Sequence, residues 1–175
     1  MVNRRFLLSF VATLVAAFSL PTARAATDPV PDFLEVTRVH GSIVDVAVGN
    51  PNFSTLVSAL GATNLVSTLQ GPGPFTVFAP TNAAFAKIPA PVLNYLLASP
   101  AELKKVLLYH VAPGVKDLRF ALVPKDFKTV NGQRIYAKAT QTTLRINNAQ
   151  VQGKVIRVNN GVIYVIDSVL LPQYR

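Results

Sequence analysis

Few side chains in this sequence could carry out catalysis, and their types and spacing do not suit it. The 175 residues include two histidines, His40 and His110, and no cysteine, which excludes disulfides, thiolate nucleophiles and thiolate metal sites. A hydrolase would need Thr81 or Ser168 as the nucleophile, His110 as the base, and a carboxylate to orient the base. The turn that presents such a nucleophile usually reads Gly-x-Ser-x-Gly, and no such run surrounds Thr81. We therefore predict a protein that is not an enzyme and has no metal or cofactor, with a hydrolase kept as an alternative.

His110 and Asp167 are polar residues inside otherwise apolar patterns. His110 lies on the apolar face of a helix expected to begin at Pro100, and a neutral histidine buried there needs a backbone or hydroxyl partner. Asp167 interrupts the apolar strand expected over 162–171, where an unpaired buried carboxylate would be costly. We interpret His110 as a buried, hydrogen-bonded side chain. We expect Asp167 to accept hydrogen bonds from backbone or hydroxyl groups, or to lie on the exposed face.

The stretch FTVFAPTNAAF, residues 75–85, predicts a buried strand followed at once by a helix. Thr81 suits the N-cap of a helix over 82–87, because its hydroxyl can accept a backbone N–H. We interpret the turn as a joint that packs the helix onto the sheet, and not as the mount of a reactive group. The residues to which we assign a structural role are Phe75, Phe78, Pro80, Thr81, Asn82, Phe85, Asp167 and Pro172.

The order of the expected elements, helices first and hairpins afterwards, is typical of an α+β domain. Asn50 and the proline after it mark a helix start, and Gly61 is expected to end that helix in a left-handed conformation. Ser99 is expected to cap a later helix through its side chain. Asn-rich turns then separate short strands, which we expect near 128–130, 133–139, 143–146, 149–152, 154–158 and 162–170.

The first 39 residues divide into an export signal and a linker. A pair of arginines precedes the apolar run 6–20, and a small-residue cleavage pattern ends at Ala25, so we expect a signal peptide over 1–25. Residues 26–39 are predicted to be a linker, and the folded domain is expected over 40–173. We expect a secreted or periplasmic protein without a transmembrane segment in the mature chain. The arginine pair leaves the twin-arginine export route open beside the general secretory route.

Positive charge is concentrated in the second half of the sequence. Residues 26–99 carry two basic and four acidic side chains, whereas residues 100–175 carry twelve basic and four acidic ones. Export argues against nucleic acid as a partner, whereas long-range attraction would allow an anionic polysaccharide, lipopolysaccharide or phospholipid surface. The alternative is that the charge only keeps a secreted domain soluble. The basic side chains that we predict to contact a partner are Lys125, Lys128, Arg134, Lys138, Arg145 and Arg157.

Three ordered motifs resemble those of the fasciclin domain family. GPFTVFAPTNAAF (residues 73–85) resembles its first signature, YHV (109–111) its central Tyr-His motif, and NNGVIYVIDSVLLP (159–172) its second signature. The helical segment 42–69 is also similar to the opening of the family, so the resemblance covers about 40–173. It implies two β-sheets that form a wedge, with several helices packed against them.

The resemblance also implies a non-catalytic extracellular module for adhesion to cells, matrix or other proteins. It adds Tyr109 and His110 as the family's pair, with a structural role and a place in a partner-binding surface. The sequence contains no Asp-Ile pair and no Arg-Gly-Asp, and Ser168 follows Asp167, which argues against integrin recognition of the animal type. A domain that holds an apolar small molecule between sheet and helices stays open as a further alternative.

Overall fold

The computed structural model describes residues 35–119, 121 and 123–172 of the chain. The expected signal peptide over 1–25 and most of the expected linker lie outside these residues. The end of that linker is corrected, because Val36–Arg38 forms strand β1, which pairs in parallel with β8 (Val155–Val158). The ordered domain therefore begins before residue 40.

The first sheet has a parallel pair of strands, β2 (Phe75–Pro80) and β9 (Gly161–Ile166), near its centre. The strand order is β1-β8-β9-β2-β3, with β3 (Val111–Pro113) at one edge. Every residue of β9 except Val165 is buried, and so is all of β2 after Phe75. A strand pair whose two faces are both covered needs apolar residues on both faces, which explains the continuous apolar runs in the sequence.

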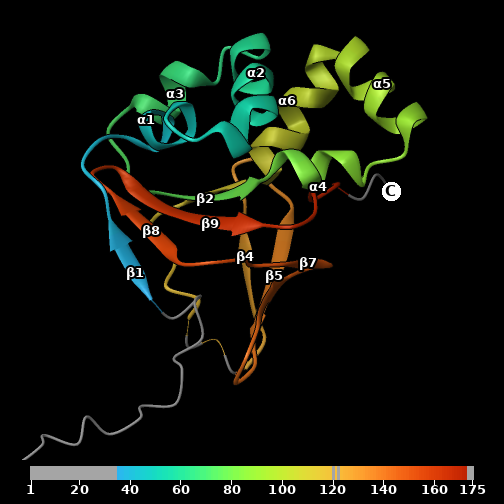
Figure 1. The fold of residues 1–175 in the computed structure, drawn as a ribbon. Coiled ribbons are helices and arrows are strands. Elements are labelled where there is room, and N and C mark those ends of the chain that lie inside the picture. Colours follow the sequence, from blue (N-terminus) through green and yellow to red (C-terminus); the bar gives the residue numbers. More distant parts are fainter. Residues whose placement is uncertain (1–34, 120, 122, 173–175) are drawn as a thin grey trace, which may run out of the picture.

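Helices cover one face of this sheet (Figure 1). Their apolar side chains, among them Phe53, Leu56 and Leu107, pack with Val77 and Ile163 of the central strands. The helices are α1 (Ile43–Val48), the 3-10 helix η2 (Pro51–Phe53), α2 (Ser54–Ala62), α3 (Val66–Gln70), α4 (Asn82–Ala86), α5 (Ala90–Ala98) and α6 (Pro100–Tyr109).

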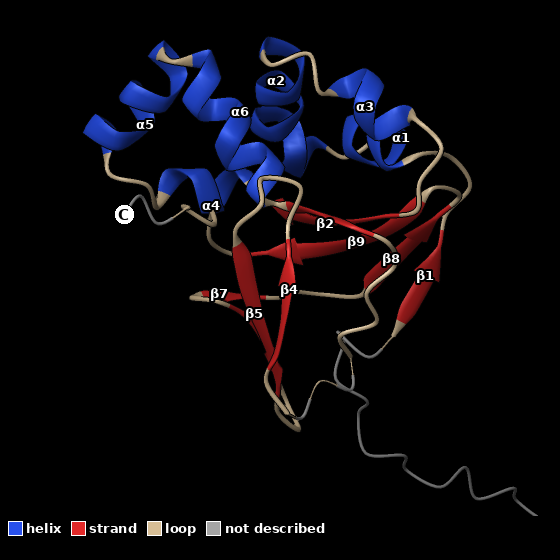
Figure 2. Ribbon diagram, turned by 180° about the vertical axis from the view of Figure 1, so that it is seen from behind, coloured by secondary structure: helices blue, strands red, loops and turns tan. Residues whose placement is uncertain are grey.

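The second sheet projects from the opposite face of the first, so that the two sheets form a wedge (Figure 2). Its strands are β4 (Lys125–Lys128), β5 (Arg134–Ala139), β6 (Leu144–Ile146) and β7 (Ala149–Gln150), in that spatial order. A separate apolar core fills the wedge, where the ring of Phe78 stacks on Tyr164 with 5.7 Å between ring centroids and on Phe127 with 6.0 Å. The expected α+β class and the two-sheet wedge are confirmed.

Two details of the expected helices are wrong. Gly61 lies inside α2, and Asn64 instead takes the left-handed conformation, with φ of 56°, after the helix ends. The side chain of Ser99 makes no capping hydrogen bond at the start of α6. In contrast, the side chains of Asn50 and Thr81 cap their helices as expected, by accepting hydrogen bonds from the backbone N–H groups of Asn52 and Ala84.

The central strands approach each other too closely for a side chain at one point. A Cβ atom placed on Gly161 would lie 2.1 Å from the carbonyl oxygen of Phe75 and 3.0 Å from Cδ1 of Ile43. Beside it, the side chain of Asn160 accepts a hydrogen bond from the Ile43 backbone N–H and donates to the carbonyl of Leu69. The Asn-Gly pair therefore joins the first sheet to α1 and α3.

Replacing Gly161 with alanine is expected to destabilise the fold by about 1–3 kcal/mol, because the two strands must separate to admit the methyl group. Gly61→Ala is the matched control, because nothing lies within 4 Å of a Cβ there and Gly61 is inside a helix. That control should gain roughly 0.5–1 kcal/mol. Urea unfolding of both variants measures the difference, and equal stabilities would contradict the close-approach argument.

Candidate functional site

His110 is held on both sides by backbone groups. Its Nδ1 lies 2.7 Å from the carbonyl oxygen of Val106, and its Nε2 lies 2.9 Å from the backbone nitrogen of Leu170. A carbonyl only accepts hydrogen bonds and a backbone N–H only donates them, so Nδ1 carries the proton and Nε2 is the acceptor. The side chain, only 2% exposed, therefore ties the end of α6 to the segment after β9 as a neutral group.

This arrangement leaves His110 no free nitrogen with which to act as a base. Burial lowers its pKa to about 4, against the smaller opposing effect of the bond to Val106. The hydroxyl of Thr81 caps α4, and that of Ser168 lies 3.1 Å from the Asp167 carboxylate to which it donates. These positions argue against the hydrolase alternative. Among the described residues, no group of three or more histidine or acidic side chains could hold a metal ion.

Thr81 and Asn82 together form the joint between β2 and the helices. The side-chain oxygen of Asn82 accepts from the Thr55 backbone N–H at 3.0 Å, and its nitrogen donates to the Pro51 carbonyl and the Ser54 hydroxyl. Asn82 thus satisfies groups at the start of α2 while it begins α4. Of the other residues assigned a structural role, Phe78, Pro80, Phe85 and Pro172 are buried and Phe75 is partly buried.

Asp167 directly follows β9, the central strand of the first sheet, and its carboxylate has three hydrogen-bond donors. Its carboxylate accepts from the Gln150 backbone N–H at 2.8 Å, from the Ser168 hydroxyl, and from the Lys87 ammonium at 3.1 Å. Burial alone would raise the pKa of this carboxyl, but the three donors outweigh it and the pKa is lowered. The hydrogen bonds expected for Asp167 are therefore present, from both a backbone and a hydroxyl donor.

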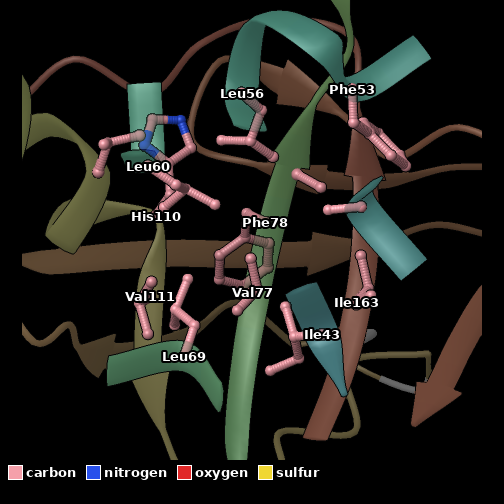
Figure 3. Close-up of a pocket in the computed structure, with 13 residues that line it drawn as sticks. Ile43, Phe53, Leu56, Leu60, Leu69, Val77, Phe78, His110, Val111 and Ile163 are labelled. Atoms are coloured by element: carbon pink, nitrogen blue, oxygen red, sulfur yellow. The ribbon is translucent and has the colours of Figure 1, made fainter. Parts of the chain in front are cut away.

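The space between the helices and the first sheet is too small for a ligand. Figure 3 shows its lining, in which His110 lies beside Leu60 among side chains made only of carbon. The cavity there measures about 20 Å³, and a neighbouring cavity beneath α5 and α6 about 60 Å³. Ligand sites usually measure about 300–1,000 Å³, so this region gives no support to the apolar small-molecule alternative.

An open groove of about 850 Å³ lies between the second sheet and the segment that follows β9. Its apolar wall includes Leu171, whose side chain is 41% exposed. The groove contains two of the predicted partner-binding residues, Tyr109 and Arg134. Its complete lining is Tyr109, Gln133, Arg134, Tyr136, Asn147, Asn148, Val169, Leu171 and Pro172.

Tyr109 supports the groove from beneath and is itself buried. Its hydroxyl donates to the carbonyl of Arg134 at 3.0 Å and accepts from the side-chain nitrogen of Asn147 at 2.9 Å. Asn147 in turn exchanges hydrogen bonds with the backbone of Tyr136, through its own N–H and its side-chain oxygen, both at 2.8 Å. These bonds fix the backbone on which Arg134 and Tyr136 are mounted. Burial raises the pKa of Tyr109, so it stays a neutral donor.

We call the solvent-facing side of β4, β5 and β6 the outer face. Along β5 the inward residues are buried and Arg134, Tyr136 and Lys138 point outward. The register places Lys128 of β4 opposite Arg134, and Arg145 of β6 opposite Lys138. The outer face is therefore defined by Asp126, Lys128, Arg134, Tyr136, Lys138 and Arg145.

Three predicted partner-binding residues belong neither to the outer face nor to the groove. Lys125 is paired with inward-facing Ala137, so it lies at the edge of the sheet on the other side. Arg157 belongs to β8 of the first sheet and lies 3.8 Å from the carboxylate of Asp117. His110 is buried in the interior. The structure brings Lys128, Arg134, Lys138 and Arg145 together on one sheet face.

Tyr136 and Asn147 are not among the partner-binding residues predicted from the sequence. The alternation Arg-Ile-Tyr-Ala-Lys-Ala over 134–139 already places Tyr136 on the same face as the two cations, because residues two apart share a face. Asn147 lies in an Asn-rich turn and has φ of 52°, a conformation that asparagine tolerates. Its contact with Tyr109, distant in the sequence, could not be read from the turn itself.

Comparisons with known proteins agree with the fold. The Fasciclin domain model matches residues 51–172. The chain is 43% identical to Protein sll1483 of Synechocystis sp. over 133 residues, which is 75% of this chain and 73% of that protein. It is 36% identical to the cell surface glycolipoprotein MPB83 of Mycobacterium bovis over 135 residues, covering 74% of this chain and 60% of that protein.

A solved structure of a FAS1 domain pair from the insect cell adhesion molecule fasciclin I has the same fold. It superposes with a TM-score of 0.57 at 18% identity, over 75% of this chain and 51% of that one. In the described part of the chain, every helix is too short or too polar to cross a bilayer.

The neutral state of His110 predicts acid sensitivity. Because its pKa falls from 6.5 to about 4 on folding, the unfolded chain binds more protons between these values. The contribution of His110 to the free energy of unfolding is therefore fully present above pH 6.5. It should decline as the pH falls toward 4, by up to ~3 kcal/mol. Urea unfolding over this pH range measures the decline.

The carboxyls of Asp117 and Asp167 do not obscure this window. The Arg119 guanidinium lowers the pKa of Asp117, and hydrogen bonds outweigh burial to lower that of Asp167. The stability that both carboxylates contribute is therefore present above their unfolded pKa of 3.8 and is lost as the pH falls below it. His110→Gln should abolish the decline, whereas replacing the exposed His40 should preserve it. A decline that persists in His110→Gln would contradict the assignment of the acid sensitivity to His110.

Asn82→Ala is expected to destabilise the fold by about 1–3 kcal/mol, because it leaves backbone groups at the start of α2 without partners. Asn94→Ala, on the exposed surface of α5, is the control and should change stability by less than ~0.5 kcal/mol. Thermal and urea unfolding distinguish the two variants. Similar losses in both would argue against the role of Asn82 as a joint.

Proposed function

This chain belongs to the fasciclin domain family, and we propose that it is a non-catalytic interaction module that works outside the cytoplasm and binds a partner through its surface. The observation that supports this proposal is that the buried polar groups are hydrogen-bonded within the fold. In the described residues, no buried side-chain nitrogen or oxygen lacks a hydrogen-bond partner. Three side chains could in principle take part in catalysis, namely His110, Thr81 and Asp167. Each of them instead links structural elements through hydrogen bonds.

The outer face and the groove beside it are the surface that supports binding. Within residues 35–172 as described, Lys128, Lys138 and Arg145 form no ion pair, so their charges are available to a partner. The partner is a protein or an anionic polysaccharide of the cell envelope. The likeness to a protein named as a cell surface glycolipoprotein, together with the export signal expected over 1–25, supports a secreted or periplasmic location.

A pull-down with the purified protein tests this proposal. The protein, immobilised on a resin, should retain a component of envelope or extracellular-matrix extract. If charge contributes, retention should weaken as salt is raised. A screen of ester and glycoside substrates should show no turnover.

A turnover that disappears in Thr81→Val or Ser168→Ala would contradict the non-catalytic assignment. Failure to retain any component at low salt would contradict the interaction role. Both variants should be compared with wild type by circular dichroism, so that a lost signal is not due to unfolding.

A further inference from the structure

We propose that the outer face binds a segment of a carboxylated polysaccharide, with the ring of Tyr136 as the platform for a sugar and the flanking cations as the carboxylate contacts. The inference rests on the proposed function and assigns it a ligand class and a site. Its basis is the geometry of one exposed ring, the placement of four cations around it, and the composition of the adjoining groove.

Tyr136 is an exposed aromatic side chain on a fixed backbone. Its side chain is 59% exposed, while its backbone N–H and C=O are both bonded to Asn147. Asn147 is held in turn by Tyr109, which is buried. An aromatic ring presents a negative face that attracts positively polarised hydrogens, such as the C–H groups on one side of a sugar ring. Because the backbone that carries this ring is already ordered, binding costs little backbone conformational entropy.

The cations around Tyr136 face one another across neighbouring strands, where like charges repel. Lys128 lies directly opposite Arg134, and Lys138 lies directly opposite Arg145. Like charges directly opposite each other destabilise a sheet, and an anion bound between them would relieve this cost. The described outer face has a single carboxylate, Asp126, which is paired with Arg134.

A carboxylate fits this arrangement well. Arginine presents a planar fork that binds carboxylates through two parallel hydrogen bonds, and lysine adds a flexible point charge. Along β5 the outward residues 134, 136 and 138 are spaced by roughly 6.6–6.8 Å. The ring of Tyr136 thus lies between Arg134 and Lys138. This alternation suits a polysaccharide in which carboxylate groups recur from one sugar to the next.

The groove extends the site with polar and apolar groups side by side. Asn148 is exposed at its rim, and the side-chain nitrogen of Asn147 has a second N–H beyond the one given to Tyr109. Leu171 and Val169 provide apolar wall. Sugars present hydroxyls and C–H surface together, which these groups match.

A membrane surface fits less well than a polysaccharide. Peripheral membrane binding combines cations with apolar side chains that enter the bilayer. The outward positions of β4, β5 and β6 carry no exposed aliphatic side chain among the described residues. Phospholipid vesicles therefore serve as a contrasting probe.

The test is binding of the full protein to alginate oligosaccharides, which are linear uronate polymers, measured by calorimetry at two salt concentrations. Wild type should bind alginate and should not bind neutral dextran oligosaccharides. Tyr136→Ser should weaken alginate binding by ~10-fold or more, and Lys138→Gln/Arg145→Gln should weaken it by a similar factor and reduce its salt dependence.

The chain offers matched controls. Tyr95 on α5 is 60% exposed, nearly the same as Tyr136, so Tyr95→Ser should leave binding unchanged. Arg38→Gln/Lys104→Gln removes one arginine and one lysine at exposed positions elsewhere. It lowers the net charge by the same amount and should retain most of the affinity. Equal losses in the control and test variants would show that only net charge matters and would overturn the site.

Asp126→Asn provides a test that unfolding cannot mimic. It removes the carboxylate from the outer face and releases Arg134, so alginate should bind several-fold more tightly. Unchanged or weaker binding would count against the proposal. Equal binding of phosphatidylglycerol vesicles or single-stranded DNA, with the same response to Tyr136→Ser, would overturn the assignment to carboxylated sugars.

Failure of this inference can be told apart from failure of the proposed function. If the protein retains an envelope component, but does not bind alginate and retains the component equally after Tyr136→Ser, the sugar site is wrong and the interaction role stands. If it retains nothing in either assay, both are wrong.

Discussion

The whole fold depends on the burial of both faces of one parallel strand pair, β2 and β9. Val77 and Ile163 face the helices, whereas the next residues along, Phe78 and Tyr164, face the second sheet. Each strand therefore contributes alternately to two cores, and neither core is complete without it. The absence of a side chain at Gly161 lets the pair approach, and His110 closes the structure around it by accepting a bond from Leu170, just beyond β9.

This constraint explains the structural contacts that the polar residues of the signature motifs make. Thr81, Asn82, His110, Asn160 and Asp167 all lie where a helix or turn meets the central strands, and there backbone groups would otherwise be buried without partners. Such positions require short polar side chains with defined donors and acceptors. A motif whose residue types suggest catalysis can therefore have a structural role instead. The contacts of each residue distinguish the two roles.

Local signals predicted much of the fold and little of the binding surface. The caps at Asn50 and Thr81 were predictable because capping depends on a few neighbouring residues. Strand β1, in a segment rich in turn residues, depends on a partner strand distant in the sequence. At the end of α2, the helix continues past Gly61, and Asn64 takes the left-handed conformation. The sequence predicts Lys125 and Arg157 as partner-binding residues from their charge and their position near the hairpins. Their true positions follow from sheet register and sheet membership, neither of which the sequence states.

The alternation along β5 also has a consequence for how such a domain can diversify. Ile135, Ala137 and Ala139 anchor the strand in the interior, and the residues between them touch solvent. Substitutions at the outward positions can thus change the charge and shape of the sheet surface without disturbing its interior. The architecture therefore constrains only every second residue of this strand.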